Sequence, residues 1–278
     1  MSVHPQADQP SSNRKPVNLA TLRKAKETGE KFTMLTCYDY SFAKAMDAAG
    51  VDMLLIGDSL GMVVQGHDST LPVTLEDIAY HTACVAKAKP TAMVVADMPW
   101  GSYQVSPEQA YESAAQLMAI GAQMVKLEGG AWLEPTVKFL TERGIPVCAH
   151  LGLTPQSVHT LGGYKVQGRG AAGDQLIADA KTLQDAGAAI VLVELIPTPL
   201  GKRLEESLHV PTIGIGAGPH TTGQVLVLHD ILDVTPGKKA RFVKNYLAQA
   251  GSVQGAFAAF VQEVKTGAYP QPEHGFAE

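Results

Sequence analysis

Short apolar runs alternate with longer amphipathic stretches along most of the chain. Near-continuous apolar runs are typical of parallel strands that are buried on both faces, and amphipathic stretches between them are typical of the helices that cover such a sheet. The pattern therefore predicts eight strands that alternate with helices, near residues 32–39, 52–59, 91–99, 123–129, 145–152, 189–195, 211–218 and 224–232.

Two of the predicted helices have clear start signals. Thr74 is followed three residues later by Asp77, and Ser106 is followed directly by Pro107, which is favoured at the first helical position. Eight strand–helix units in about 200 residues favour a closed (β/α)8 TIM barrel over an open doubly wound sheet. A crossover helix barely fits between the last two runs, so the assignment of one of these two runs as a strand is left open. Residues 237–267 are predicted to form extra terminal helices outside the barrel.

Length and composition are consistent with one enzyme-sized domain. The chain has 278 residues, and we expect a single barrel domain with C-terminal helices over 17–278, preceded by a polar, Pro/Ser-rich tail over 1–16 that is disordered or loosely attached. The tail lacks the apolar stretch of a secretory signal, and no run is long enough to span a membrane. The net charge of −5 without a Lys/Arg block argues against nucleic acid and anionic membranes as partners.

The three cysteines indicate a reducing compartment. Cys37, Cys84 and Cys148 have no CxxC spacing and an odd count. We therefore expect reduced core thiols in a cytoplasmic protein, with neither a disulfide nor a zinc site.

Polar residues occur where most of the predicted strands end, which is the end at which barrel enzymes place their catalytic groups. Taken singly, such an Asp is more often a helix cap and such a His more often a core residue. Together they predict an active site, formed by Asp58, Ser59, Asp97, Lys126, Glu128, His150 and Glu194.

The residue types at these positions favour one kind of chemistry. Lys126 and Glu128 are two apart in a strand and share a face, so the buried lysine is expected to hold an anion. Asp58, Asp97 and Glu128 supply hard oxygen ligands without a Cys or His cluster, which favours Mg²⁺ over zinc. Glu194 leaves a strongly apolar strand, so we expect its surroundings to favour the neutral form and suit it to be a general base; a salt bridge to Lys or Arg is the alternative.

A divalent cation beside such a base suits enolate chemistry on a 2-oxo acid. The metal would chelate the keto and carboxylate oxygens, the base would remove the C3 proton, and the metal would hold the enolate. The resulting carbanion would attack a one-carbon or carbonyl electrophile.

Three long segments, residues 34–78, 150–169 and 211–234, closely resemble the ketopantoate hydroxymethyltransferase family, and the similarity covers roughly residues 17–270. The resemblance implies a barrel of the phosphoenolpyruvate/pyruvate type that transfers a hydroxymethyl group from 5,10-methylenetetrahydrofolate to 3-methyl-2-oxobutanoate, giving 2-dehydropantoate for pantothenate biosynthesis. It also implies a homo-oligomer, commonly a decamer. The same resemblance implies that the Mg²⁺-associated carboxylates are Asp58, Asp97 and Glu128 and that the proton acceptor is Glu194. It implies that the contacts to the oxo acid come from Asp58, Ser59, Asp97 and Lys126.

Three alternatives remain open from the residues. Lys126 could form a Schiff base in an aldolase, although a nucleophilic lysine must be neutral and nearby carboxylates would keep this one charged. The glycine run 214–218 could cradle the phosphate of a phosphosugar, or could be a tight turn. A non-enzymatic binding protein would be expected to have lost some of the charges at the strand ends, and this chain keeps them all.

Overall fold

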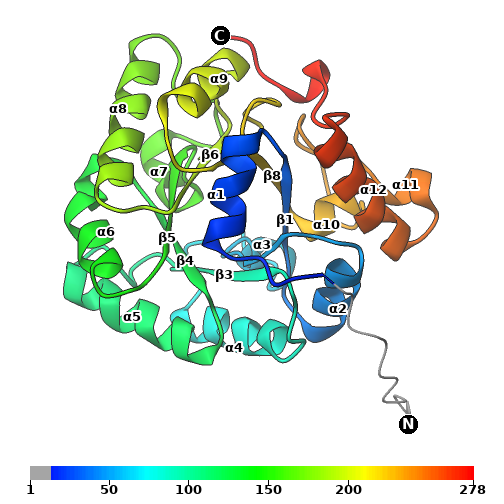
Figure 1. Cartoon of the computed structure of the whole chain (residues 1–278), viewed down its shortest axis with the longest axis horizontal. Helices are drawn as coiled ribbons and strands as arrows, with labels where there is room; N and C mark the ends of the chain where they lie inside the picture. The colour runs from blue at the N-terminus through cyan, green and yellow to red at the C-terminus, as the bar shows by residue number, and fades with distance from the viewer. Residues whose placement is uncertain (1–13) are drawn as a thin grey trace.

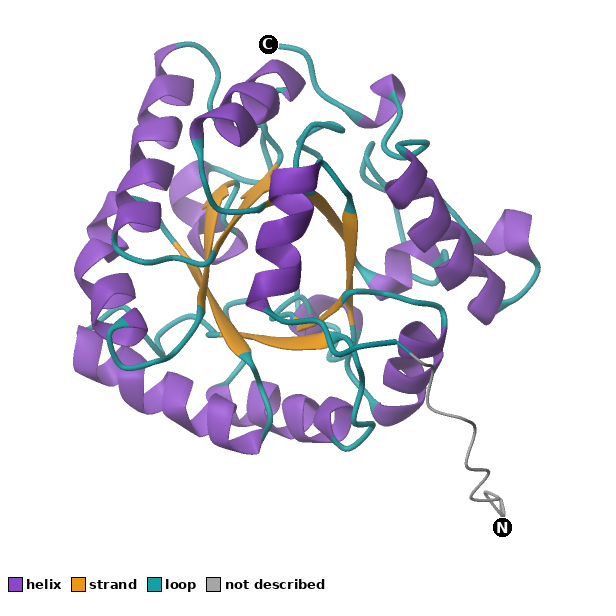
Figure 2. Cartoon of the chain, in the orientation of Figure 1, coloured by secondary structure: helices purple, strands orange, loops and turns teal. Residues whose placement is uncertain are grey.

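Eight parallel strands form a closed barrel at the centre of the computed structural model, which describes residues 14–278 (Figures 1 and 2). The strands pair in sequence order, and β8 pairs with β1 to close the ring, with Met34 opposite Val225. The prediction of a (β/α)8 barrel is confirmed. The strands are β1 (Phe32–Thr36), β2 (Met53–Ile56), β3 (Met93–Asp97), β4 (Met124–Glu128), β5 (Val147–Gly152), β6 (Ile190–Glu194), β7 (Thr212–Ile215) and β8 (Gly223–Leu226).

Helices surround this ring on the outside (Figure 2). The α-helices are α1 (Leu19–Thr28), α2 (Tyr40–Ala48), α3 (Leu60–Val63), α4 (Leu75–Ala86), α5 (Pro107–Ile120), α6 (Glu134–Thr141), α7 (Val158–Leu161), α8 (Ala171–Asp185), α9 (Thr198–Ser207), α10 (Leu228–Ile231), α11 (Leu247–Ala250) and α12 (Val253–Thr266). Short 3₁₀ helices are η1 (Ala131–Leu133), η2 (Pro155–Ser157) and η3 (Pro272–His274). The predicted terminal helices are confirmed as α11 and α12, and α12 packs against α2 and β1.

Both predicted helix starts are confirmed as caps. The Thr74 hydroxyl accepts a hydrogen bond from the Asp77 backbone N–H at 3.1 Å, while the Asp77 carboxylate accepts one from the Thr74 N–H at 2.9 Å. The Ser106 hydroxyl accepts from the Gln109 N–H at 3.2 Å, and Pro107 opens α5. Each cap satisfies backbone donors that the helix itself leaves unpaired, and a cap of this kind stabilises by about 1 kcal/mol.

Both strands of the doubtful last pair exist, and no helix connects them. Residues 216–222 join β7 to β8 directly, with Gly216 and Gly218 in left-handed conformations at φ +60° and +81°. Lys31 holds this connection, because its ammonium donates to the carbonyl oxygens of residues 219, 220 and 221 at 3.1, 3.1 and 2.6 Å. A side chain from elsewhere in the sequence thus satisfies three backbone carbonyls of this connection.

The two ends of the barrel differ. Helix α1 precedes β1 and lies across the N-terminal opening, in front of the ring in Figure 1. Of the predicted tail over 1–16, residues 1–13 lie outside the described part. Arg14, by contrast, is attached: it pairs with the Asp52 carboxylate and donates to the Val51 carbonyl at 2.7 Å. No helix within residues 14–278 is long and apolar enough to cross a membrane.

The cysteines are free thiols, as predicted. Cys37 and Cys148 are buried, and burial raises the pKa of each thiol to about 12. Cys84 is half-buried on α4. The two core thiols therefore remain protonated and serve as small packing groups.

Candidate active site

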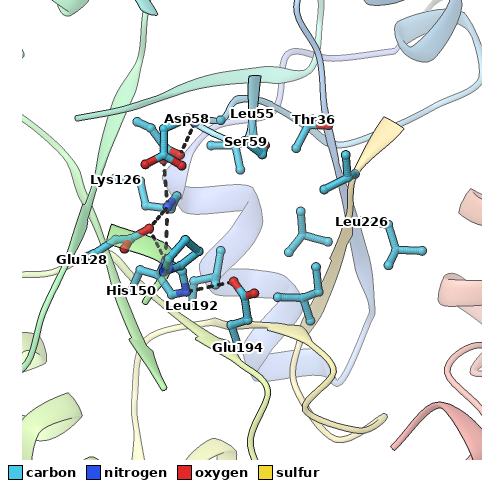
Figure 3. Close-up of a pocket in the computed structure, with 16 residues that line it drawn as sticks. Thr36, Leu55, Asp58, Ser59, Lys126, Glu128, His150, Leu192, Glu194 and Leu226 are labelled. Atoms are coloured by element: carbon cyan, nitrogen blue, oxygen red, sulfur yellow. Dashed lines mark hydrogen bonds and ion pairs between the residues drawn. The ribbon is translucent and has the colours of Figure 1, made fainter. Parts of the chain in front are cut away.

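A cavity of about 420 Å³ opens at the C-terminal ends of the strands, opposite α1 (Figure 3). The ends of the strands converge there because a parallel barrel places all its carboxyl ends on one face. The structure brings every predicted site residue to the lining of this cavity: Asp58, Ser59, Asp97, Lys126, Glu128, His150 and Glu194.

One wall of this cavity, called the charged wall below, is formed by Asp58, Asp97, Lys126, Glu128 and His150. Lys126 lies at its centre. Its ammonium nitrogen is 2.9 Å from Asp97 Oδ1, 3.6 Å from Glu128 Oε1 and 3.2 Å from His150 Nδ1. Lys126 and Glu128 therefore share a face, as the strand alternation predicted. The anion expected beside the buried lysine is present within the chain, and Asp97 is the nearest one.

The surroundings of Lys126 keep its amine protonated. Burial alone would lower its pKa, but the negative charges of Asp97, Glu128 and Asp58 outweigh burial and hold the pKa well above its usual value. A Schiff base requires a neutral amine. This charge arrangement therefore counts against the aldolase alternative.

Asp58 and Asp97 form a close carboxylate pair. Asp97 Oδ2 accepts a hydrogen bond from the Asp58 backbone N–H at 2.8 Å. Burial, followed by the charges of Asp97 and Glu128, raises the pKa of Asp58 well above its usual value. Burial also raises the pKa of Asp97, although Lys126 opposes it. A cation bound beside this pair would stabilise the ionised forms of both carboxylates.

The donor set fits a hard divalent cation held partly by water and substrate. Buried Asp97 Oδ1 and Glu128 Oε1 receive no well-directed hydrogen bond, and the cavity holds four carboxylates against one lysine and one histidine. Within residues 14–278, no three His, Cys, Asp or Glu side chains are arranged around one point. Mg²⁺ commonly uses only one or two protein carboxylates. Ligation of Mg²⁺ by Asp58, Asp97 and Glu128 stays a prediction.

His150 links the charged wall to Glu194. Its Nδ1 lies 3.3 Å from Glu128 Oε1, and its Nε2 lies 3.4 Å from Glu194 Oε2. Burial and the charge of Lys126 oppose protonation of the ring, but the contacts with Glu128 and Glu194 outweigh them and raise the pKa of His150 to about 8. His150 Nε2 thus faces the Glu194 carboxylate as an ion-pair partner, without a well-directed hydrogen bond.

The surroundings of Glu194 differ in part from what the sequence predicts. The side chain lines the cavity, but it is 16% exposed, so its burial is less complete than the apolar strand before it implies. The cause is its position as the last residue of β6, at the open mouth of the barrel. Among the described residues its ion-pair partner is His150, so the alternative of a salt bridge to Lys or Arg does not hold.

Gln156 is a buried site residue that sequence reasoning missed. Its side-chain nitrogen donates to Asp58 Oδ2 at 2.9 Å, and its backbone N–H donates to Glu128 Oε2 at 2.9 Å. A neutral amide four residues beyond β5 carries no charge or spacing signal that would single it out. Its place within segment 150–169, which carries part of the family resemblance, is the one signal that could have found it.

Much of the remaining lining of the cavity is apolar. Leu226 lies across the cavity from Glu128 in Figure 3, and Glu194 lies between the charged side and this apolar one. Ser59 completes the polar rim, where its hydroxyl is 2.9 Å from the Tyr38 hydroxyl. The apolar lining consists of Leu55, Leu192, Ile215, Val225, Leu226 and Val227.

Close packing accounts for the glycine run 214–218. A Cβ on Gly214 would lie 2.7 Å from Thr221, one on Gly216 would lie 2.8 Å from Phe242, and one on Gly218 would lie 2.5 Å from Thr198. Each glycine is needed because another segment approaches its backbone. The run therefore gives no support to a phosphate cradle.

Comparison with known proteins identifies the family. The family model described as ketopantoate hydroxymethyltransferase matches residues 16–272, nearly the whole described chain. The chain belongs to the ketopantoate hydroxymethyltransferase family. It is therefore an enzyme that transfers a hydroxymethyl group.

Two relatives show how far the similarity extends. The 3-methyl-2-oxobutanoate hydroxymethyltransferase of Janthinobacterium sp. (strain Marseille) is 60% identical over 94% of this chain and 96% of its own length. The enzyme of the same name from Neisseria meningitidis serogroup A is 58% identical over 94% of this chain and all of its own.

Solved structures are similar at the level of the fold. A phosphonopyruvate hydrolase in complex with oxalate and Mg²⁺ has a TM-score of 0.59 at 14% identity and covers 93% of each chain. A 2,3-dimethylmalate lyase, described as a member of the PEP mutase/isocitrate lyase superfamily, has a TM-score of 0.53 at 18% identity, over 75% of this chain and 80% of its own. These two structures share the barrel fold with this chain, and the phosphoenolpyruvate/pyruvate type stays a prediction from the family resemblance.

Proposed function

We propose that the protein transfers a hydroxymethyl group from 5,10-methylenetetrahydrofolate to 3-methyl-2-oxobutanoate and so forms 2-dehydropantoate for pantothenate biosynthesis. The observation that carries the proposal is 60% identity, over 94% of the chain, to a relative named for this oxo acid, in a chain whose strand ends assemble the cavity described above. Methylenetetrahydrofolate enters as the one-carbon donor that the family resemblance implies.

The cation of this proposal is Mg²⁺, and Asp58 and Asp97 are the residues that would hold it, with Glu128 beside them. When bound, Mg²⁺ supplies a positive charge for the keto and carboxylate oxygens of the oxo acid and makes its C3 proton more acidic. The support is the chemistry of the donor set: hard oxygen atoms, surplus negative charge and buried carboxylate oxygens that receive no well-directed hydrogen bond.

In this proposal each side chain of the site has a separate role. Glu194 removes the C3 proton as general base, and the Nε2–H of His150, 3.4 Å away, keeps its carboxylate oriented. The Lys126 ammonium offsets negative charge that develops on the oxo acid, while Asp58, Ser59 and Asp97 complete the polar contacts to it. The apolar wall opposite receives the methyl groups next to the reacting carbon.

Water cleaves both C–N bonds of the folate methylene bridge and so releases tetrahydrofolate and a one-carbon unit at the oxidation level of formaldehyde. The electron pair left at C3 adds to the carbon of this unit, and its oxygen, which came from water, takes the proton held by Glu194 and becomes the hydroxyl. The same resemblance leads us to propose a homo-oligomer, a decamer, as the assembled form.

Deuterium exchange at C3 of 3-methyl-2-oxobutanoate tests the proposal without folate. The ¹H NMR spectrum of the oxo acid is followed in D₂O with the protein, first with Mg²⁺ and then with EDTA. We expect the C3 proton signal to disappear only when metal is present. Equal exchange with Mg²⁺ and with EDTA would exclude a role of the metal in removal of the C3 proton. No exchange under either condition would exclude 3-methyl-2-oxobutanoate as the substrate.

A further inference from the structure

We propose that Gln156 is a positioning residue of this active site, whose side-chain amide fixes how the Asp58 carboxylate is presented to a bound cation and whose backbone N–H does the same for the Glu128 carboxylate. The inference rests on the proposed function for the cation itself. Gln156 lies in η2, directly beyond β5, and is buried. Within residues 14–278, it is the one residue whose side chain and backbone each donate to a different carboxylate of the charged wall.

The orientation of the amide is determined by its neighbours. Its nitrogen faces two acceptors, Asp58 Oδ2 at 2.9 Å and the Met98 carbonyl oxygen at 3.0 Å. Its oxygen faces two donors, the Tyr103 hydroxyl at 2.7 Å and the Gln104 amide at 3.3 Å. Rotation by 180° would place acceptors against acceptors, so both N–H groups remain committed and Asp58 Oδ2 stays occupied.

The same residue restrains Glu128 from two directions. The Gln156 backbone N–H donates to Glu128 Oε2, and the Tyr103 hydroxyl that donates to the Gln156 amide accepts from the Glu128 backbone N–H at 3.1 Å. One oxygen of each carboxylate is thereby held by Gln156. Asp58 Oδ1 and Glu128 Oε1 are the oxygens that Gln156 leaves for a ligand, and Glu128 Oε1 has only the longer contacts to His150 Nδ1 at 3.3 Å and to the Lys126 ammonium at 3.6 Å.

This arrangement should matter most for cation affinity. Groups that orient metal-binding carboxylates typically change metal affinity by about 10- to 100-fold when they are removed. Gln156→Met keeps the length of the side chain but removes both donors and the acceptor. In this variant we expect the Asp58 carboxylate to lose its fixed orientation while the barrel remains folded.

The test measures Mn²⁺ binding directly, from the electron paramagnetic resonance signal of free Mn²⁺ titrated with protein. Gln156→Met should raise the dissociation constant by about 10- to 100-fold. In the C3 exchange assay it should raise the Mg²⁺ concentration needed for half-maximal rate more than it lowers the rate at saturating Mg²⁺. Gln175→Met, which removes an exposed glutamine bonded to Asp179 on α8, should leave the dissociation constant at the wild-type value.

A folded Gln156→Met protein that binds Mn²⁺ within twofold of wild type would overturn the assignment. If that variant does not fold, Tyr103→Phe decides, because it keeps the ring and removes the hydroxyl that donates to the Gln156 amide and accepts from the Glu128 backbone N–H. It should raise the dissociation constant severalfold, and unchanged binding would overturn the assignment. Wild-type protein that binds no Mn²⁺ would overturn the metal part of the proposed function, and with it the role of Gln156.

Discussion

His150 shows how single atoms decide the state of the proposed base. The Lys126 ammonium has only protons to offer, so a neutral His150 that accepts one on Nδ1 must carry its own proton on Nε2. A protonated ring carries a proton on Nε2 as well. In both states the histidine presents an N–H to Glu194, 3.4 Å away, and restrains the carboxylate that we assign as base.

Glu194→Gln tests the assignment at the scale of this residue. The amide keeps the shape of the side chain and can still accept a hydrogen bond from His150, but it cannot take the C3 proton. We expect deuterium exchange to slow by roughly 10²- to 10⁴-fold, the usual contribution of a general base, while binding of the oxo acid and Mn²⁺ is retained. Exchange at a rate near wild type would exclude Glu194 from the role.

At the scale of elements, the close approach of β5 and β6 sets the position of Glu194. Gly152 pairs in register with Glu194, and its φ is +88°. A Cβ at Gly152 would lie 2.4 Å from the Glu194 carbonyl oxygen. The backbone that carries the proposed base is therefore placed by a neighbouring strand that has no side chain at this point.

Gly152→Ala should move this backbone, and Gly144→Ala is its matched control. Gly144 also has a left-handed conformation, with φ +81°, but no atom lies within 4 Å of its would-be Cβ. Both variants carry the conformational cost of about 1–2 kcal/mol. The clash should cost Gly152→Ala about 1–3 kcal/mol more in free energy of unfolding, measured by urea titration, and should slow C3 exchange. Equal stabilities and exchange rates for the two variants would contradict this account.

At the scale of the whole molecule, the barrel places stabilising contacts and chemistry at opposite ends. Asp52 lies just before β2, at the end away from the cavity, and joins three parts of the chain. It pairs with Arg14 near the start of the described chain and with Lys265 in α12, and it accepts from the Thr33 backbone N–H in β1 at 2.9 Å.

Asp52→Asn should therefore lower stability without changing the chemistry. The amide retains an acceptor for Thr33 but loses the charge, and we expect a loss of about 1–3 kcal/mol in urea unfolding with C3 exchange at the wild-type rate. Asp174→Asn, which breaks an exposed pair with Arg203, should cost less than about 1 kcal/mol. Equal losses in the two variants, or slowed exchange in Asp52→Asn, would contradict the separation of the two ends.

Particular residues show how much of the fold and of the site could be predicted from the sequence. Apolar runs and the Thr74 and Ser106 caps are local signals, so strands, helices and the closed barrel could be predicted. The β7–β8 connection could not, because the side chain that holds it, Lys31, comes from a distant segment. Gln156 could not either, since its importance lies in two carboxylates that arrive from other strands.

The sequence by itself determined which charged residues would share the barrel mouth, because each follows an apolar strand and parallel strands end on one face. Only the tertiary structure decided which of them touch. The register of β4 against β5 places Glu128 opposite His150, and the packing of neighbouring strand ends brings Lys126 within 2.9 Å of Asp97. Such contacts depend on register and packing between strands, which no local pattern of apolar and polar residues encodes.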